Sequence, residues 1–136
     1  MPYRFQTISK AEMPQYKDAV MEFFSSFGYP EDYSAAIDNS AFVCVCWFED
    51  KIIGGVRALS DLSRFAFIVD LNVKKLHQNK GNGKQLVTNI VQACLDAEVR
   101  YIELGTDANY PWLEDFYTKI GFSKITYSVF MEWPRR

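Results

Sequence analysis

The residues best suited to chemistry lie between Gln78 and Lys84, where a glycine-containing turn precedes a long helical pattern. Gly81 and Gly83 permit positive φ angles and a close approach of the backbone to a ligand. The first N–H groups of a helix lack internal acceptors, and the helix dipole favours negative charge there. Lys80 and Lys84 add positive charge. The turn therefore predicts a site for an anion such as a diphosphate; a helix start that merely uses convenient glycines is the alternative.

Other reactive residue types are too few for metal or redox chemistry. The chain holds three cysteines, Cys44, Cys46 and Cys94, without a CxxC pair, and one histidine, His77. Neither a disulfide framework nor a zinc site has enough ligands, so no metal site is expected. Cys44 and Cys46 stand two apart in an apolar strand and Cys94 lies on an apolar helix stripe, which favours core packing over covalent catalysis. We expect His77 to be exposed or to contact the turn.

Hydrophobic spacing predicts the elements that position this turn. Alternating residues indicate strands, and a period near 3.6 indicates helices. The Ser9-x-x-Glu12 pair is a capping arrangement for a first helix that Gly28 and Pro30 end. The expected elements are a strand (3–8), a helix up to residue 27, a short helix (31–38), a hairpin (41–48 and 52–59), a strand (65–73), the long helix up to residue 97, a strand (101–104), a helix (111–120) and a final strand (124–133).

This order predicts a mixed α+β fold. The unit from residue 65 to residue 104 should be a right-handed parallel strand-helix-strand crossover, attached to an antiparallel hairpin. The central sheet is therefore mixed but mostly antiparallel, with about four helices. We see no repeat, low-complexity tract or linker, so the chain is expected to form a single domain over residues 1–136.

Length and charge limit the partners. The chain has 136 residues, with 15 Lys plus Arg against 17 Asp plus Glu, so its net charge is −2. This balance does not drive binding to nucleic acid or to an anionic membrane. The longest apolar stretch, residues 41–48, is far below the roughly 20 residues that span a bilayer, and the start of the chain lacks a secretory signal. We expect a cytoplasmic protein with a small or locally recognised partner.

Two motifs resemble those of one enzyme family. Gln78-x-x-Gly81-x-Gly83 follows a predicted strand, and residues 116–122 read FYTKIGF. This pair resembles the GNAT acetyltransferase superfamily, whose usual wording is Q/R-x-x-G-x-G/A followed by Y-x-x-x-G-F. The resemblance implies a GNAT-like fold, acetyl-CoA as co-substrate, and direct transfer of the acetyl group to a primary amine, preferably of a small molecule. It also implies that the protein could form a homodimer, because small members of the family often do.

The resemblance also implies which residues bind acetyl-CoA. The strand residues Leu71, Asn72 and Val73 would face the pantetheine arm, in a slot opened where this strand parts from residues 101–104. The pyrophosphate would lie on the turn, and Asn109 stands near the place where relatives carry an asparagine that bonds the cofactor. The turn residues concerned are Gln78, Asn79, Lys80, Gly81, Asn82, Gly83 and Lys84.

Two residues are the catalytic candidates. We expect Tyr117, with an ordinary pKa near 10, to protonate the departing thiolate, and a backbone N–H near Val73 to polarise the thioester carbonyl. A tyrosine that only packs on the sheet is the alternative. Some relatives use a glutamate as the base, but Phe67 stands at that position, so Asp70 is the nearest carboxylate. Asp70 could equally be a surface residue or a structural acceptor, and a family bulge in this strand would alter which face it occupies.

Aromatic residues of the first two helices suggest the acceptor side. They could stack a flat or apolar amine, although helical spacing also explains them as core. Three other functions stay open: an acyl-CoA sensor without catalysis, a protein N-acetyltransferase, and a module that binds nucleotide phosphates. The aromatic residues are Phe23, Phe24, Phe27, Tyr29 and Tyr33.

Overall fold

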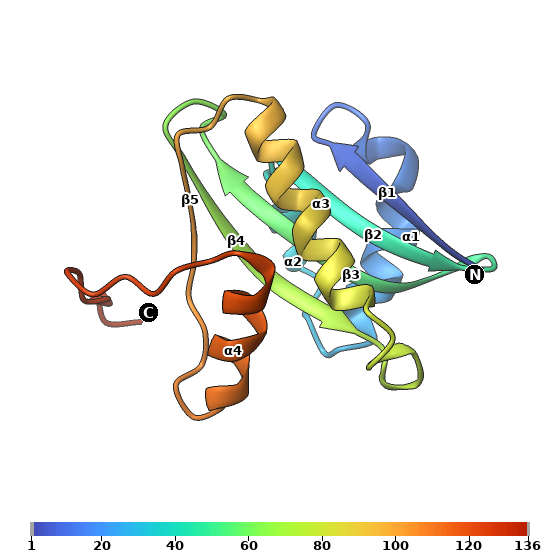
Figure 1. Ribbon diagram of the computed structural model, residues 1–136. Helices are drawn as coiled ribbons and strands as arrows, with labels where there is room; N and C mark the ends of the chain where they lie inside the picture. Colours follow the sequence, from blue (N-terminus) through green and yellow to red (C-terminus); the bar gives the residue numbers. More distant parts are fainter. Residues whose placement is uncertain (1, 136) are drawn as a thin grey trace. The chain divides into compact units, whose positions relative to one another are not determined.

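The computed structural model describes residues 2–135 and divides into two compact units, one up to Gly105 and one from Thr106 onward. The first unit contains a five-stranded sheet with helices on its faces, and the second unit contains α4 (Figure 1). The elements are β1 (Tyr3–Ser9), α1 (Met13–Ser25), α2 (Tyr33–Asp38), β2 (Phe42–Phe48), β3 (Lys51–Ser60), β4 (Phe65–Val73), the 3₁₀ turn η1 (Lys75–His77), α3 (Asn82–Asp96), β5 (Tyr101–Leu104) and α4 (Pro111–Ile120).

The sheet confirms the predicted fold class. Its strands lie in the order β1-β2-β3-β4-β5, and the first four pair antiparallel. The last pair, β4 with β5, is parallel and is connected through α3, as the crossover predicted. The parallel strand-helix-strand unit therefore occupies one edge of an otherwise antiparallel sheet.

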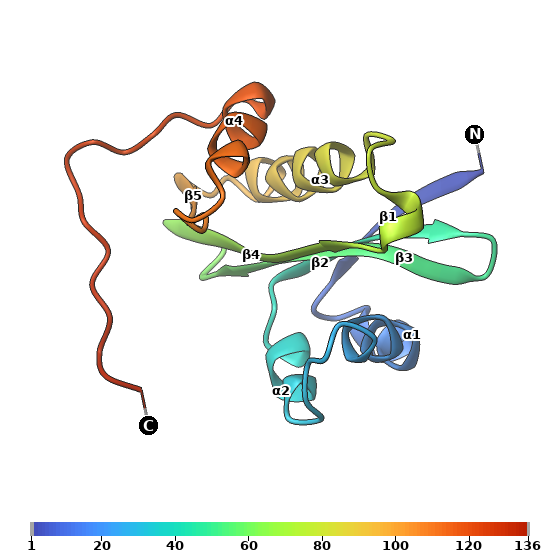
Figure 2. The same ribbon diagram turned by 90° about the horizontal axis from the view of Figure 1, so that it is seen from below.

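The helices of the first unit cover both faces of the sheet. Figure 2 shows α1 and α2 on one face and α3 on the other. Two adjacent glycines of β3 allow this close packing. A Cβ on Gly54 would lie 2.9 Å from Leu86 Cδ1 of α3, and a Cβ on Gly55 would lie 3.0 Å from Phe23 Cε2 of α1. Because successive strand residues face opposite sides, these glycines bring one helix close to each face.

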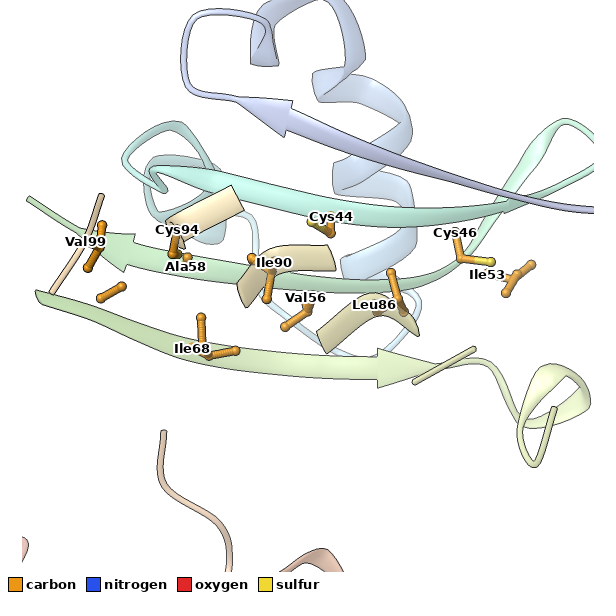
Figure 3. Close-up of a cluster of buried hydrophobic side chains, with 11 residues drawn as sticks. Cys44, Cys46, Ile53, Val56, Ala58, Ile68, Leu86, Ile90, Cys94 and Val99 are labelled. Atoms are coloured by element: carbon orange, nitrogen blue, oxygen red, sulfur yellow. The ribbon is translucent and has the colours of Figure 1, made fainter. Parts of the chain in front are cut away.

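Two hydrophobic clusters form the core of this unit. One lies between the sheet and α3 and includes all three cysteines (Figure 3). The other joins α1 and α2 to the opposite face through residues such as Phe24. The cysteines are unpaired and buried, and burial raises the pKa of the Cys44 and Cys46 thiols to about 11. Core packing of these cysteines is therefore confirmed.

The predicted final strand is wrong. Among residues 2–135 the sheet ends at β5, and the segment after α4 is irregular. A strand requires a neighbour for its N–H and C=O groups, and none is paired with this segment in the described part of the chain. Its alternating apolar residues therefore remain exposed, among them Tyr127, Val129, Met131 and Trp133.

The first helix begins at Met13, three residues later than a cap at Ser9 implies. The Ser9 hydroxyl and backbone N–H both donate to Glu12 Oε1, at 2.8 and 3.0 Å. These bonds close a turn between β1 and α1 rather than cap the helix, which begins at Met13 without a side-chain cap. The Glu12 N–H also donates to the Ser9 hydroxyl oxygen at 3.4 Å, so the reciprocal bonds of the Ser-x-x-Glu pattern are present, but they lie in the turn that precedes the helix.

Candidate functional site

The turn between β4 and α3 bends twice through left-handed residues. Asn79 has a φ angle of 60° and Gly81 a φ angle of 83°, and α3 begins at the next residue, Asn82. Gly83 lies inside the first turn of α3 and is not among the residues with positive φ. The expectation that both glycines permit positive φ is therefore met by Gly81 alone, and Asn79 supplies the other bend. Asn tolerates this region better than most residues.

Side chains of the turn hold its carbonyl groups. Gln78 Nε2 donates to the Val73 carbonyl at 2.9 Å, and Asn82 Nδ2 donates to the His77 carbonyl at 3.1 Å. Asn82 is only 4% exposed, and this second bond is partly buried. His77 Nδ1 lies 2.8 Å from the hydroxyl of Tyr3 on β1. The expected contact of His77 with the turn is thus made by its carbonyl, whereas its imidazole packs against Tyr3 of β1 and Phe48 of β2.

The amide groups of the turn have no acceptor. Within residues 2–135, no hydrogen bond starts from the backbone N–H of Asn79, Lys80 or Gly81. The first three amides of α3 also lack an acceptor within the helix. Lys80 and Lys84 are exposed beside these donors. This arrangement suits an anionic oxygen cluster such as a diphosphate.

β4 and β5 pair over four residues. Their ladder runs from Phe65 with Tyr101 to Ile68 with Leu104, and in the described chain β4 continues to Val73 without a partner on that side. β5 pairs along its whole length, so the unpaired stretch of β4 begins where β5 ends and does not come from the expected parting of the two strands. Leu71, Asn72 and Val73 are half-buried in the unpaired stretch. Backbone groups on its open side remain available to the amides of an extended ligand.

A β-bulge lies at the start of this unpaired stretch. Gly55 of β3 pairs with Asn72, and Arg57 pairs with Val69, so Asp70 and Leu71 both lie opposite one residue of β3. Asp70 adopts a left-handed φ angle of 59°. A bulge re-aims the side chains beside it. It turns the Asp70 carboxylate towards the face covered by α1 and α2, where it contacts residues of that layer.

The Asp70 carboxylate lies in a polar cluster that reaches three elements. Arg57 Nε donates to Asp70 Oδ2 at 2.9 Å and contacts the Tyr33 hydroxyl at 2.7 Å, while Tyr33 also donates to Oδ2. Tyr29 donates to the other oxygen, Oδ1, at 3.4 Å. Asn72 Nδ2 in turn donates to the Tyr29 hydroxyl at 3.2 Å. Asp70 is thus both the candidate base and a structural acceptor.

The sequence-based prediction missed the cationic member of this cluster. Arg57 is 8% exposed, and its guanidinium also lies over the Tyr33 ring, 5.0 Å from the centroid. Burial, followed by the hydrogen bond to Asp70, raises the pKa of Tyr33, and burial also raises the pKa of Tyr29. The available signal was a single charge inside an apolar strand, between Val56 and Ala58. A buried charge of this kind requires a partner.

The aromatic residues proposed for the acceptor side divide into two groups. Phe23 and Phe24 are buried core residues, with 2% and 0% exposure. Tyr29 and Tyr33 instead bring their hydroxyls to Asp70, with ring centroids 4.4 Å apart. Phe27 is partly exposed and packs edge-on against Phe23. Two of the five aromatic residues therefore belong to the polar cluster.

The second unit holds the two remaining candidates. Tyr117 lies on α4, and its ring makes edge contacts with Phe116 and Phe122. Burial raises the pKa of the Tyr117 phenol. Asn109 lies in the turn before α4, where its backbone N–H donates to Asp107 Oδ1 at 2.9 Å. The structure thus brings together Asp70, residues 71–73 and the turn in the first unit, and describes Asn109 and Tyr117 separately in the second.

The described residues offer neither a metal-ion site nor a membrane-spanning helix. Within residues 2–135, no group of three or more His, Cys, Asp or Glu side chains is arranged to hold a metal ion. In the same part of the chain, none of the helices combines the length and the apolar character needed to cross a membrane.

The sequence matches a known enzyme family and several of its members. Residues 5–122 match the acetyltransferase (GNAT) family. The chain is 39% identical over 74 residues to GCN5-related N-acetyltransferase 2, chloroplastic, of Arabidopsis thaliana, a match that covers 54% of this chain and 28% of that protein. It is 33% identical over 91 residues to the uncharacterized N-acetyltransferase ycf52 of Gracilaria tenuistipitata var. liui, covering 64% and 48%. The chain thus spans less than half the length of these curated relatives.

Solved structures share the fold. A GNAT family acetyltransferase from Streptococcus pneumoniae TIGR4 has a TM-score of 0.81 at 19% identity and covers 98% of both chains. An aminoglycoside acetyltransferase from an uncultured soil metagenomic sample, in complex with trehalose, has a TM-score of 0.73 at 19% identity, covering 99% of this chain and 97% of that one. AAC(6′)-Iy, in complex with a bisubstrate analog of CoA, has a TM-score of 0.72 at 14% identity, covering 98% and 99%.

The mixed sheet and the amide-lined turn agree with the family match. The chain belongs to the acetyltransferase (GNAT) family, as its two motifs indicated. The matched residues include both the turn at Gly81 and the helix that carries Tyr117. Members of this family use acetyl-CoA, and one structural neighbour is bound to a CoA analog.

Proposed function

We propose that this protein is an acetyl-CoA-dependent N-acetyltransferase that transfers the acetyl group directly to a primary amine of a small molecule. The turn between β4 and α3, with its free amides next to the unpaired end of β4, is the observation that carries the proposal. The turn binds the diphosphate, and the unpaired stretch at Leu71, Asn72 and Val73 receives the pantetheine arm. Both features lie in the first unit, on consecutive parts of the chain.

The cofactor-binding role extends over seven turn residues. Their backbone amides and the two lysines contact the diphosphate, and Asn109 of the second unit bonds the cofactor further along. We propose that the two units act as one domain, because the family match runs across both of them. The turn residues are Gln78, Asn79, Lys80, Gly81, Asn82, Gly83 and Lys84.

The chemistry needs a proton removed from the amine and a proton supplied to the thiolate. The amine nitrogen forms a bond to the thioester carbon as the C–S bond breaks. The Val73 amide polarises the carbonyl, Asp70 takes the ammonium proton, and Tyr117 gives its phenol proton to the sulfur. The FYTKIGF motif supports the role of Tyr117, whose phenol is protonated at neutral pH and so carries the proton to give. The bulge supports the role of Asp70, because it lies at the start of the stretch of β4 that β5 leaves unpaired.

The amine substrate is proposed to be small. Aminoglycoside acetyltransferases are among the structural neighbours, which supports an amine acceptor for this chain too. Cytoplasmic location and assembly as a homodimer are part of the proposal. The exposed apolar residues after α4 support assembly, because large apolar side chains are usually covered. Sedimentation equilibrium tests the dimer.

Calorimetry and a thiol-release assay test the function. Acetyl-CoA should bind with micromolar affinity and resist displacement by ATP, and a panel of small amines should release CoA thiol. In that assay Tyr117→Phe and Asp70→Asn should lower turnover with saturating substrates, by the roughly 100-fold typical of general acid or base groups. Binding without release of thiol on any amine would indicate an acyl-CoA sensor instead. Acetylation of protein N-termini alone would overturn the small-molecule acceptor.

A further inference from the structure

The two oxygens of the Asp70 carboxylate have different environments. Oδ2 accepts hydrogen bonds from Arg57 Nε, at 2.9 Å, and from the Tyr33 hydroxyl. Among residues 2–135, the hydrogen bond to Oδ1 comes from the Tyr29 hydroxyl alone, at 3.4 Å. The Asp70 side chain is 25% exposed, whereas the Arg57 side chain is 10% exposed. Oδ2 is therefore fully occupied by the protein, and Oδ1 is the oxygen that can exchange a proton.

Tyr29 connects Asp70 Oδ1 to the unpaired end of β4. The residue lies between α1 and α2, and its hydroxyl accepts a hydrogen bond from Asn72 Nδ2 at 3.2 Å while donating to Asp70. Asn72 belongs to the unpaired stretch of β4, next to the proposed path of the pantetheine arm. The phenol oxygen has two acceptor positions, and Asn72 occupies one of them. The second remains for a donor from outside the cluster.

The Tyr29 ring is held firmly enough to present that position. It packs against Tyr33 with ring centroids 4.4 Å apart and against Phe24 at 5.5 Å, and Phe24 is a buried core residue. Burial raises the pKa of the Tyr29 phenol, so the hydroxyl is protonated at neutral pH and can donate to Asp70. The hydroxyl is thus fixed on one side by Asn72 and directed on the other towards Oδ1.

We propose that Tyr29 is a further catalytic residue, which contacts the acceptor amine and passes its proton to Asp70 Oδ1. This inference rests on the proposed function. As the amine nitrogen binds the acetyl carbon, the ammonium proton moves to the Tyr29 oxygen and the Tyr29 proton moves to Oδ1. Tyr29 ends unchanged and Asp70 ends protonated. Asp70 later releases this proton to water, so no other reactant is required.

Arg57 and Tyr33 act as positioning residues in this scheme. They bind Oδ2 and so direct Oδ1 towards Tyr29, and Arg57 supplies the positive charge that balances the carboxylate. Arg57 Nη1 is itself held by the Ser40 hydroxyl at 3.3 Å. Because Tyr29 and Tyr33 bind different oxygens of one carboxylate, substitution of each should affect the reaction differently.

The test compares tyrosine substitutions in the whole chain. Tyr29→Phe should lower kcat with saturating substrates roughly 10- to 100-fold, with acetyl-CoA affinity unchanged, because it removes a proton path and no cofactor contact. Tyr16→Phe is the matched control: this α1 tyrosine has no hydroxyl partner among the described residues, and the variant should behave as wild type. Combining Tyr29→Phe with Asp70→Asn should be no worse than the slower single variant, since both lie on one path.

Each outcome decides between the claims. If Tyr29→Phe retains wild-type kcat across pH 6 to 9, the relay is wrong while the proposed function stands. If the two substitutions multiply in their effects, Tyr29 and Asp70 act separately and the relay is again wrong. A wild-type protein that acetylates no amine overturns the proposed function, and the relay with it. Urea denaturation of Tyr29→Phe establishes that the lost activity is not lost folding. Should this variant unfold, Asn72→Ala, which removes the hydrogen bond that orients the Tyr29 hydroxyl, must lower kcat with saturating acetyl-CoA, and an unchanged kcat would overturn the relay.

Discussion

Arg57 on β3 and Asp70 in the bulge of β4 form a largely buried ion pair, with Nε 2.9 Å from Oδ2. The same guanidinium contacts Tyr33 at the start of α2 and the Ser40 hydroxyl beyond the end of that helix. One side chain therefore links the helix layer, the centre of the sheet and the strand proposed to bind the cofactor. The bulge that aims Asp70 depends on this link, because a non-glycine residue in the left-handed region costs energy that its surroundings must offset.

Replacing Arg57 should cost more than replacing a surface cation. Arg57→Gln leaves the Asp70 charge half-buried without its partner, so the free energy of unfolding should fall by roughly 2 to 3 kcal/mol, less than for a fully buried pair. Lys51→Gln is the control, because its 3.0 Å ion pair with Glu22 is exposed and screened by solvent, so its loss should change the free energy of unfolding far less. Urea denaturation measures both. Equal losses would mean that the Arg57 pair contributes no more than a surface contact.

Gly81→Ala should weaken cofactor binding through the backbone alone. A Cβ at Gly81 would meet no atom within 4 Å, but its φ angle of 83° disfavours any L side chain by about 1 kcal/mol. Gly28 is a matched control, with a φ angle of 87° and the same empty surroundings, on the loop after α1. Both Ala variants should lose similar stability in urea. Calorimetry should find weaker acetyl-CoA binding only for Gly81→Ala; a similar loss of affinity in Gly28→Ala would contradict the assignment of the turn.

The cysteines should resist alkylation in the folded protein. With pKa values of about 11, Cys44 and Cys46 hold only about one thiolate per thousand at pH 8, and they are also buried. Maleimide labelling followed by intact mass measurement should therefore detect modification only after denaturation. Cys44→Ala should retain acetyl transfer, since no thiol takes part in it. Rapid labelling of the native protein, or loss of turnover in Cys44→Ala without loss of folding, would favour covalent catalysis.

Stability should fall at alkaline pH. The pKa of Tyr33 is raised in the folded protein above its ordinary value of 10.0. Below about pH 10 the Tyr33 phenol is protonated in both the folded and the unfolded chain, so its titration does not change the free energy of unfolding. Above that pH the unfolded chain loses the proton first, which favours unfolding. The urea midpoint should decrease from pH 9 to pH 11, and decrease less in Tyr33→Phe. An identical slope in both proteins would exclude Tyr33 as the source.

Local patterns predicted the elements around the turn well. The bounds of β4, β5 and α4 agree with those expected from the sequence, because each element begins or ends at a clear change of period or at a proline or glycine. The glycine turn was located for the same reason, since Gly81 must adopt a left-handed φ angle where it precedes α3. Element bounds and tight turns depend on residues that are neighbours in the sequence, so the spacing of residues predicts them.

The polar cluster depends on contacts between distant parts of the chain. Tyr33 and Arg57 are 24 residues apart and Tyr29 and Asp70 are 41 apart, so no local spacing relates them. The bulge also breaks the alternation that would have assigned Asp70 to a face of the sheet. The strand predicted after α4 was wrong for a different reason. Its alternation of apolar residues is strong, but a strand needs a paired neighbour, which sequence alternation alone does not supply.

The central claim is that this chain moves an acetyl group from acetyl-CoA to a primary amine. The most direct measurement is mass spectrometry of an amine panel after incubation with the protein and acetyl-CoA, with the released CoA thiol counted in the same samples. We predict at least one small amine that gains a single acetyl group, in equal amount to the thiol released, and a strong reduction in Tyr117→Phe. Acetyl-CoA that binds but is never consumed with any amine would contradict the claim.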